Sequence, residues 1–448
     1  MSFISKIVLE IEKNPPRLIA LSFVLVILIG SILLTLPISS ATGEFTNPLD
    51  STFTATSAVC VTGLVTKNTY EHWSNFGHLV IITLIQIGGL GFMTWAILIS
   101  LVMKKRITLK ERLIIHEQMN TLSLKGMVRL VIYVIKATLA IELLGAVLLS
   151  FTFIPQFGIW KGAWYSIFHS ISSYCNAGFD IIGPNSISPY VKSIGVVLPI
   201  SFLIILGGIG FNVFMDISSK KSFKKLAAHS KLVLTMTAYL LIGGAIIFFI
   251  LEYSNEMTIK SFSLPEKILA SFFQSVTTRT AGYSSINQDL IRDSSAIVSI
   301  ILMFIGGSPA GTAGGIKTTT LGLLLYSTKS EIKGTEDVVL FRRRIPISTI
   351  RKALAIVMIS MTWVMGISLI LTITEKTLFI DILYEVTSAF GTVGLSRALT
   401  PSLTVIGKLL IMLTMYLGRL GPLTFAFAFY KKERKEQYRE PKGDILVG

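Results

Sequence analysis

The sequence predicts an all-α integral membrane protein built from four parallel repeats, each with an outer helix, a short re-entrant segment and an inner helix. Three observations support this fold class. Of the 448 residues, 52% are hydrophobic and only 15% are charged, whereas about a quarter of a soluble domain is charged. Several uncharged runs are long enough to cross a bilayer. Four short apolar stretches recur at a regular interval, and each ends at a glycine.

The uncharged runs predict a chain that crosses the membrane several times. A helix needs about 20 predominantly apolar residues to span the hydrocarbon core of a bilayer. Five runs meet this requirement, and they lie at residues 18–36, 79–103, 193–215, 232–251 and 353–374.

The net charge of +16 is explained by topology. Of the 41 Lys and Arg residues, 28 fall in the segments 1–17, 103–129, 219–231, 327–352 and 430–442. The positive-inside rule places both termini and the three basic connections in the cytoplasm. We assign ten others, including Arg279 and Lys408, to the loops on the opposite side. No nucleic-acid motif or aromatic-basic platform accompanies the charge, so a nucleic acid is excluded as a partner.

The repeats follow one another at a nearly constant interval along the chain. Because each unit begins and ends on the cytoplasmic side, all four have the same orientation and are related by an axis along the membrane normal. The predicted units span residues 14–103, 126–219, 231–328 and 350–430, and a basic cytoplasmic tail follows at 431–448.

Four glycines occupy corresponding positions in these units. An aromatic residue precedes each glycine by ten residues, and a leucine or an aromatic residue follows it directly. Six residues before them stand Ser57, Ser172, Val276 and Ser388. A glycine-rich turn follows each glycine at a similar separation in all four units. The four aligned glycines are Gly63, Gly178, Gly282 and Gly394.

The stretches that end at these glycines are too short to cross the membrane. Irregular backbone cannot face lipid, because its unpaired N–H and C=O groups cost several kcal/mol each. Four stretches that meet on one axis would instead turn their carbonyls into a central pore, where they can replace the hydration shell of a monovalent cation. Glycine suits this position because it accepts unusual backbone angles and keeps the axis free of side chains.

The alternative is that each glycine is an ordinary packing or turn glycine, as is frequent in membrane helices. That interpretation suits any one of them alone, whereas four in register favour the pore. The predicted cation filter comprises Val61, Thr62, Gly63, Asn176, Ala177, Gly178, Thr280, Ala281, Gly282, Thr392, Val393 and Gly394.

The four linked units, the compact loops and the motif Cys-Val-Thr-Gly-Leu of the first unit resemble the Trk/Ktr/HKT superfamily of potassium transporters, and most closely its Ktr-type membrane (pore) subunit. The resemblance covers about residues 14–430. It implies that glycine in all four units favours potassium over sodium. The second and third units read Tyr-Cys-Asn-Ala-Gly-Phe and Thr-Thr-Arg-Thr-Ala-Gly-Tyr. With one glycine per unit, we expect weaker selectivity than in a Thr-Val-Gly-Tyr-Gly channel.

From this resemblance we expect gated K⁺ uptake across the plasma membrane of a prokaryote, with Na⁺ as an activator. It also implies a homodimer with one pore per chain, docked on a cytosolic nucleotide-binding ring of the regulator-of-potassium-conductance type. Nucleotide would then act only through that partner. A less selective Na⁺/K⁺ pathway and an ion-coupled K⁺ symporter are the alternatives. A symporter would favour inverted repeats and paired acidic residues at the midplane, and the sequence contains neither.

The inner segment of the third unit, 294–326, is expected to break, unlike those of the other units. Five glycines and a proline within ten residues do not hold a regular helix. The break lies below the predicted filter, and a loop of small residues there is a candidate gate, as the resemblance also implies. The gate residues are Gly306, Gly307, Ser308, Pro309, Ala310, Gly311, Thr312, Ala313, Gly314 and Gly315.

Arg419 is the second gate candidate. A charge at membrane depth is costly and normally faces water or the protein interior. Below a cation filter, a fixed positive charge is an electrostatic barrier. The alternative is that Arg419 binds the carbonyls of 306–315 as a structural link, and the two roles are compatible.

Other charges inside the apolar segments carry less weight. Lys136 and Glu142 lie in the outer helix of the second unit, where structural roles are favoured. His169 and Glu385 lie on re-entrant helices, and for Glu385 cation attraction and local hydrogen bonding both stay open. The sequence contains no intramembrane His-Glu-x-x-His, Ser/Lys or paired-Asp arrangement, so we do not expect an enzyme.

Overall fold

The computed structural model describes residues 15–91, 94 and 127–429. The regular secondary structure in this part of the chain is helical apart from two strands of two residues each, which confirms the all-α prediction. Most of the basic connection at 103–129 and the predicted tail at 431–448 lie outside the described residues, as does much of the apolar run at 79–103.

Within the described residues, four helices are long and apolar enough to cross a membrane. Their apolar residues occur on all sides, because one face packs inward and the other meets lipid. In α2, for example, Leu34 is fully buried whereas Ile32 is 66% exposed. The long helices are α2 (Pro15–Thr35), α8 (Met127–Phe157), α12 (Ala228–Glu252) and α16 (Ile347–Thr374).

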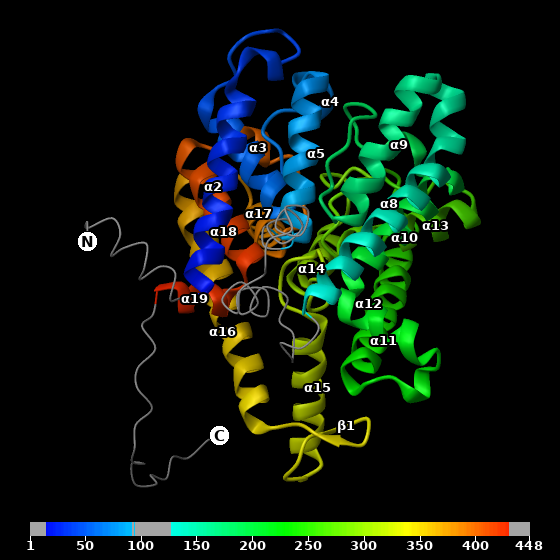
Figure 1. Cartoon of the computed structure of the whole chain (residues 1–448), viewed down its shortest axis with the longest axis vertical. Coiled ribbons are helices and arrows are strands. Elements are labelled where there is room, and N and C mark those ends of the chain that lie inside the picture. Colours follow the sequence, from blue (N-terminus) through cyan, green and yellow to red (C-terminus); the bar gives the residue numbers. More distant parts are fainter. Residues whose placement is uncertain (1–14, 92–93, 95–126, 430–448) are drawn as a thin grey trace.

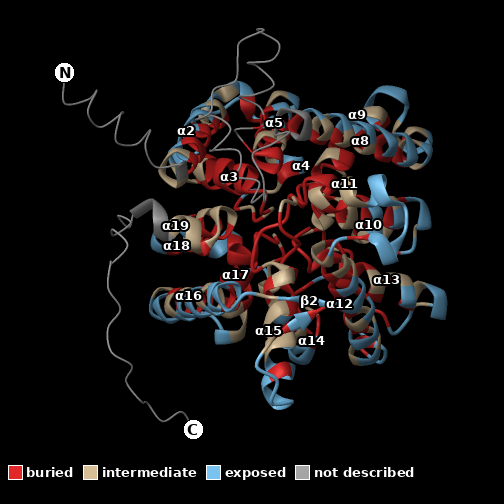
Figure 2. Ribbon diagram, turned by 60° about the horizontal axis from the view of Figure 1, so that its bottom comes forward, coloured by how far each residue is buried: buried red, intermediate tan, exposed pale blue. Residues whose placement is uncertain are grey.

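Each long helix packs against a shorter helix that follows it in the chain. Caps fix where two of these begin. The side chain of Asn47 accepts a hydrogen bond from the N–H of Leu49 at 2.9 Å, and Ser263 and Glu266 form a capping box. In all four short helices, nearly all residues of the last two turns are buried at the centre of the molecule (Figure 2). The short helices are α3 (Pro48–Cys60), α9 (Ile159–Tyr174), α13 (Leu264–Thr277) and α17 (Phe379–Gly391).

A third helix follows in each unit and stops at the glycine-rich turn. The glycines after three of them, Gly91, Gly210 and Gly421, have φ of 82°, 94° and 85°, angles that favour glycine. The chain continues in three cases as α11 (Phe211–Lys220), α15 (Thr318–Ile332) and α19 (Pro422–Phe429). The third helices themselves are α5 (Asn75–Leu90), α10 (Ile194–Ile209), α14 (Asp293–Phe304) and α18 (Val405–Leu420).

The apolar run 193–215 is divided into two helices, because α10 and α11 meet at 93° around Gly210. The inner segment of the third unit is divided between α14 and α15, so it is not alone in being broken. It differs in its connection, since residues 305–317 form a loop where Gly210 and Gly421 each link two helices directly.

The remaining elements lie at the two ends of the helices. On one side, α15 and α16 run to a small hairpin of β1 (Val339–Leu340) and β2 (Arg343–Arg344) (Figure 1). The strands are antiparallel, with Val339 opposite Arg344. Short helical turns occur in the other connections, at α4 (Thr69–His72), η1 (Pro37–Ser39), η2 (Ser188–Tyr190), η3 (Phe223–Lys225) and η4 (Thr400–Ser402).

The units follow one another around the centre of the molecule (Figure 2). The third helix of each unit packs against the short helix of the next, in the pairs α5 with α9, α10 with α13 and α14 with α17. The pair α18 with α3 then joins the last unit to the first. The short helices therefore end close together, inside a closed ring of longer ones.

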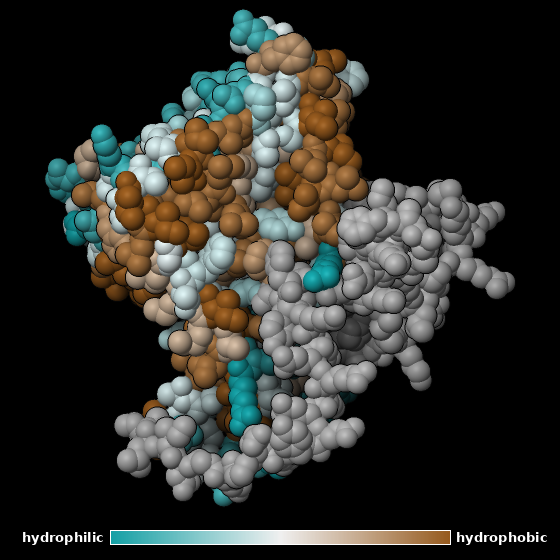
Figure 3. Space-filling model, turned by 90° about the vertical axis from the view of Figure 1, so that its left-hand side faces the viewer, coloured by the Kyte–Doolittle hydropathy of each residue, from teal (hydrophilic) through white to brown (hydrophobic). Residues whose placement is uncertain are grey.

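The outer surface is apolar where the long helices are exposed. Figure 3 shows apolar side chains gathered across one face, with hydrophilic residues toward its upper margin. The exposed apolar residues of α2 include Leu21, Leu25, Leu28 and Ile32. Such a band matches contact with lipid, as expected of a multi-pass membrane protein.

Candidate cation pathway

The four segments after the short helices share an unusual backbone. In each, the residue two positions before the aligned glycine has a positive φ, and the glycine has one too. Three of these non-glycine residues are Val61, Thr280 and Thr392, which are β-branched and strained in this region. Strain of this kind persists where the surroundings enforce it. The φ values are 57°, 61°, 67° and 50° at Val61, Asn176, Thr280 and Thr392, and 94°, 68°, 80° and 96° at Gly63, Gly178, Gly282 and Gly394.

The four aligned glycines lie in a closed ring of contacts. A Cβ added to Gly63 would strike the carbonyl oxygen of Ala177, the residue before Gly178. The same relation then runs from Gly178 to Ala281, from Gly282 to Val393 and from Gly394 back to Thr62. No glycine in the ring has room for a side chain. The predicted filter residues of all four units therefore surround one centre.

Hydroxyl groups brace each of these segments from behind. The Oγ of Ser57 accepts a hydrogen bond from the N–H of Gly63 at 3.0 Å, and Ser388 accepts from Gly394 at 3.1 Å. Ser172 donates instead to the carbonyl of Phe179 at 2.8 Å. In the third unit, Thr277 donates to the carbonyl of Tyr283 at 2.7 Å. In the sequence alignment of the units, Val276 stands at the position of these serines and has no hydroxyl. The hydroxyl that braces the third segment therefore belongs to the next residue, Thr277.

The position three residues before each glycine differs between units. It is occupied by Cys60, Cys175, Arg279 and Gly391. Arg279 is only 6% exposed, and its guanidinium donates to the carbonyls of Thr237 at 3.3 Å and Gly306 at 3.4 Å.

The assignment of Arg279 to an outer loop is therefore wrong. Its side chain ties the end of α13 to α12 and to the loop 305–317. Its register with the two buried cysteines is the signal that could have placed it correctly.

His169 and Glu385 both stand nine residues before an aligned glycine, and both hold the chain that follows it. The Nε2 of His169 accepts from the N–H of Ile181 at 3.4 Å. The carboxylate of Glu385 accepts from the hydroxyls of Ser396, at 2.6 Å, and Thr400. Local hydrogen bonding is thus the role that the structure supports for Glu385, which is fully buried.

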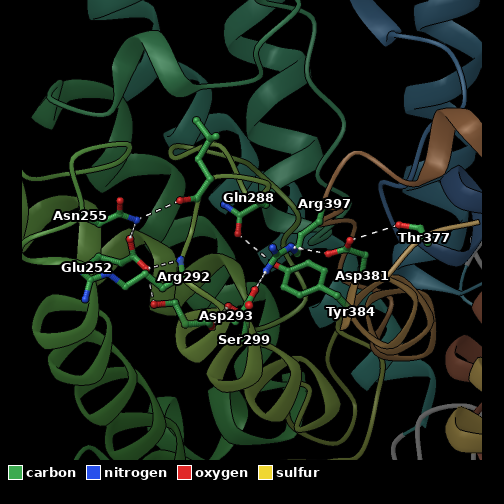
Figure 4. A network of polar contacts seen from close by, with 12 residues as sticks. Glu252, Asn255, Gln288, Arg292, Asp293, Ser299, Thr377, Asp381, Tyr384 and Arg397 are labelled. Carbon is green, nitrogen blue, oxygen red and sulfur yellow. Dashed lines mark hydrogen bonds and ion pairs between the residues drawn. The ribbon is translucent and has the colours of Figure 1, made fainter. Parts of the chain in front are cut away.

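A polar network joins the third and fourth units beside these segments (Figure 4). Arg397, three residues after Gly394, pairs with Asp381 at 2.9 Å and with Asp293 at 3.3 Å. The hydroxyl of Tyr384 donates to Gln288 at 3.0 Å. These contacts fix the chain after the fourth glycine against the third unit.

The loop 305–317 lies against the second unit. The N–H of Ser308 donates to the carbonyl of Gly208 at 2.8 Å, and that of Thr312 donates to Gly207 at 3.1 Å. The N–H of Phe211 donates in return to Ala310 at 3.0 Å. The loop also touches the fourth unit, because a Cβ on Gly314 would clash with the side chain of Thr392. The predicted gate residues are thus packed between two other units directly beside the glycine ring.

Arg419 ends α18 and bridges three segments. Its guanidinium donates to the carbonyls of Thr312 in the loop and of Gly88 and Gly89 in α5, the last at 3.0 Å. The side chain therefore makes the structural link that was one of its two predicted roles. The nearby Lys317 donates from Nζ to Ala313 at 2.7 Å.

A cavity of about 400 Å³ lies beside the loop and Arg419. None of the predicted filter residues lines it. Its walls come from the loop, from the ends of α5 and α18, and from α2, α11, α16 and α19. Residues that face it include Gly91, Pro309, Lys317, Lys352, Arg419 and Leu423.

Comparisons with known proteins agree with this arrangement. The TrkH family profile, described as a cation transport protein, matches residues 13–440. The chain is 44% identical to the potassium/sodium uptake protein NtpJ of Enterococcus hirae, over 97% of both chains. It is 43% identical to the Ktr system potassium uptake protein B of Bacillus subtilis, over 99% of both.

A solved structure shares the fold. The potassium transporter TrkH from Vibrio parahaemolyticus matches with a TM-score of 0.71 at 15% identity, covering 91% of this chain and 84% of that one. The family profile covers nearly the whole sequence, and the two relatives named above match along their full length. The chain belongs to the TrkH family of cation transport proteins, which are transporters rather than enzymes.

Proposed function

We propose that the protein takes up K⁺ through a single filter of backbone carbonyls at the centre of its four units. The observation that carries this proposal is the closed ring in which each aligned glycine abuts the carbonyl that precedes the next one. The two full-length relatives are named as potassium or potassium/sodium uptake proteins. In this proposal the units 14–103, 126–219, 231–328 and 350–430 are pore repeats, and both termini lie in the cytoplasm.

The filter chemistry follows from the backbone. Carbonyl oxygens can replace the water around a monovalent cation, and the short helices direct their partly negative C-terminal ends toward the same centre. The proposed ligand groups lie at Val61–Gly63 and at the corresponding residues of the other units. Selectivity thus rests on carbonyls held in place by the braces behind them.

We further propose that residues 306–315 and Arg419 close this pathway. The loop lies beside the glycine ring, and a guanidinium there opposes a cation electrostatically. Opening would exchange the bonds from Arg419 to Thr312 and Gly89 for other partners. In the closed state, Arg419 would then serve both as the structural link and as the electrostatic barrier.

The proposed partners are a second copy of the chain and a cytosolic nucleotide-binding ring. The Bacillus subtilis relative is named as protein B of a Ktr system, which implies further components of that system. Basic residues at the hairpin and around η3 offer a docking surface of positive charge. Na⁺ would act as an activator, and nucleotide only through the ring. The surface residues are Lys220, Lys221, Lys224, Lys225, Arg342 and Arg343.

The filter proposal is tested by K⁺ and Na⁺ fluxes in cells that lack other potassium uptake systems. Gly63→Ser and Gly394→Ser each place a Cβ against a carbonyl of the ring, so we expect a loss of K⁺ preference of at least tenfold. Gly43→Ser is the control, because Gly43 has open space around its Cβ position. Unchanged K⁺ preference in both filter variants would refute the filter.

The name of the Enterococcus hirae relative also supports a second candidate, a pathway that admits Na⁺ as well as K⁺. The same flux assay separates the two. With a selective filter, external Na⁺ should change the rate of K⁺ uptake without a matching influx of Na⁺. With a mixed pathway or a coupled symporter, Na⁺ should enter together with K⁺.

The gate proposal predicts that Arg419→Ala raises K⁺ flux in the absence of any partner. The substitution removes the positive charge and releases the carbonyls of Thr312 and Gly89. We expect an increase of several-fold in flux into proteoliposomes. Arg344→Ala, which removes an arginine from the exposed ion pair with Asp337 at the hairpin, serves as the matched control. Equal flux in the Arg419 variant and the unmodified protein would argue against a gate here.

A further inference from the structure

Glu142 is a buried acid at the middle of α8 that neither the filter nor the gate accounts for. It is 6% exposed and lies well inside the membrane span Val131–Phe157, about 16 Å along the helix from its start. An acid at this depth is rare and normally has a role. Unlike Lys136 on the same helix, which is exposed and can extend toward the surface, Glu142 faces the protein interior.

The carboxylate binds a side chain of the neighbouring unit. The Nε2 of Gln86, on α5 of the first unit, donates to Oε1 at 3.0 Å and to Oε2 at 3.2 Å. Glu142 takes part in none of the salt bridges found in the described part of the chain, which involve acids such as Asp50 and Asp381. Its side-chain partner in α5 is therefore a neutral amide. A carboxylate that receives the hydrogen bonds of an amide holds that amide in one orientation.

The oriented amide then contacts the residue that precedes the second filter segment. The thiol of Cys175 donates to Oε1 of Gln86 at 3.5 Å and lies 4.0 Å from Oε1 of Glu142. Cys175 is fully buried at the end of α9 and directly precedes Asn176, the residue with positive φ in the second filter segment. Three elements from two units thus meet immediately behind that segment.

The same contact borders the proposed gate. A Cβ on Gly89 would lie 2.7 Å from the Sγ of Cys175, so the α5 backbone packs directly on this side chain. The carbonyl of Gly89 accepts from Arg419 at 3.0 Å. The backbone of Glu142 is fixed as well, since its carbonyl accepts from Ser170 of α9 at 2.5 Å. A shift at Glu142 therefore has a short, packed route to Cys175.

The third and fourth units use different groups at the position of Cys175, whereas the first unit has another buried cysteine, Cys60. Arg279 binds backbone carbonyls there, and Gly391 has no side chain. The contacts of Cys175 with Gln86 and Glu142 therefore differ from the support that Arg279 gives the third segment.

We propose that Glu142 is a positioning residue for cation selectivity: through Gln86 it fixes Cys175 and with it the carbonyls of Asn176 and Ala177. This inference rests on the proposed filter. The carbonyls of this segment need a rigid support, because small displacements change how well they fit a dehydrated K⁺.

The test compares the K⁺ over Na⁺ preference of variants in the full-length protein. Cys175→Ala removes the thiol with little loss of volume, and Glu142→Leu removes both acceptors. We expect each to lower the K⁺ preference by about tenfold and to raise the KM for K⁺. Glu142→Gln keeps one acceptor oxygen for Gln86 and is expected to retain most of the preference.

A structural role is separated by two further variants. Glu142→Leu combined with Gln86→Leu removes both partners, which avoids an unpaired buried amide and favours folding. We expect wild-type amounts of this double variant in the membrane, with selectivity still impaired. Glu252→Gln is the matched control, since Glu252 is an equally buried carboxylate at the end of α12, bound to Asn255 at 2.6 Å and Thr258 at 2.7 Å (Figure 4). It is expected to change stability without changing ion preference.

Three outcomes decide the matter. Wild-type selectivity in Cys175→Ala and in the double variant overturns the positioning role, even if Gly63→Ser still impairs selectivity. If Gly63→Ser and Gly394→Ser also leave selectivity intact, the filter itself is refuted. Equal loss in Glu252→Gln would assign the effect of Glu142 to general destabilisation and also overturn the proposal.

Discussion

At the scale of single residues, selectivity depends on how firmly a few backbone groups are held. Val61, Thr280 and Thr392 adopt positive φ at a cost of about 1–3 kcal/mol each. The hydroxyls of Ser57 and Ser388 offset part of this cost by accepting hydrogen bonds from the glycines. The braces are therefore part of the proposed filter, although they lie outside its lining.

Ser388→Ala tests this dependence directly. The substitution leaves the N–H of Gly394 without its side-chain acceptor, and a hydrogen bond of this kind contributes about 1 kcal/mol. We expect the K⁺ over Na⁺ preference to fall about fivefold in flux measurements. Ser402→Ala makes the same chemical change on an exposed turn and should have no effect. Identical preferences in the two variants would mean that the brace is not needed.

Some residues of the candidate site could be predicted from the sequence, and others could not. The spacing of Gly63, Gly178, Gly282 and Gly394 predicted residues that the structure brings into one ring, because only glycine tolerates a carbonyl so close to its Cα. The brace in the third unit could not be assigned, since the end of α13 shifts the hydroxyl from the position of Val276 to Thr277. Arg279 was assigned to a loop because it is charged. Its carbonyl partners come from α12 and the loop 305–317, and only the tertiary structure brings them to it.

At the scale of elements, the third helices all stop at the level of the loop. The long apolar helices were predictable because composition alone marks them. The bend of 93° after α10 was not, because one glycine among apolar residues is common in membrane helices and does not by itself mark a break. The loop of the third unit packs against this bend, since a Cβ on Gly210 would strike the carbonyl of Pro309.

Gly210→Ala tests whether this bend seats the proposed gate. A Cβ there would clash with the carbonyl of Pro309, and its φ of 94° would itself cost about 1–2 kcal/mol. We expect the loop to be displaced and the basal K⁺ flux into proteoliposomes to rise several-fold. Gly334→Ala is the control, because Gly334 also has a positive φ but nothing within 4 Å of its Cβ position. A rise in both variants would assign the effect to backbone strain. A rise in neither would mean that the bend at Gly210 does not hold the proposed gate in place.

At the scale of the whole molecule, the four units must close into a ring from one continuous chain. The closing contacts join the last unit to the first. The hydroxyl of Tyr416 donates to the carbonyl of Ala20 at 2.7 Å, and Lys408 pairs with Asp50 at 2.8 Å. Lys408 lies in the first turn of α18 and not in an outer loop as its charge suggested, while Asp50 lies in the first turn of α3, where a negative charge is favoured.

This pair is expected to stabilise the closed ring. Its side chains are 15% and 8% exposed, so Asp50→Asn leaves a mostly buried ammonium without its partner. The loss should be on the order of 2 kcal/mol, below that of a fully buried pair. We expect a lower midpoint of thermal unfolding in detergent and a smaller amount of functional protein in the membrane.

The exchange of the two charges tests whether the pair acts across the ring. In Asp50→Lys with Lys408→Asp, the attraction is restored, so most of the lost stability and K⁺ flux should return, even though a positive charge disfavours the start of α3 by a few tenths of a kcal/mol. Glu256→Gln breaks the exposed pair with Lys260, four residues away in the same loop, and should change neither quantity. A ring closed mainly by apolar packing between α18 and α3 would instead leave Asp50→Asn as stable as Glu256→Gln. In that case, the apolar residues of the α18 and α3 interface, and not the ion pair, join the fourth unit to the first.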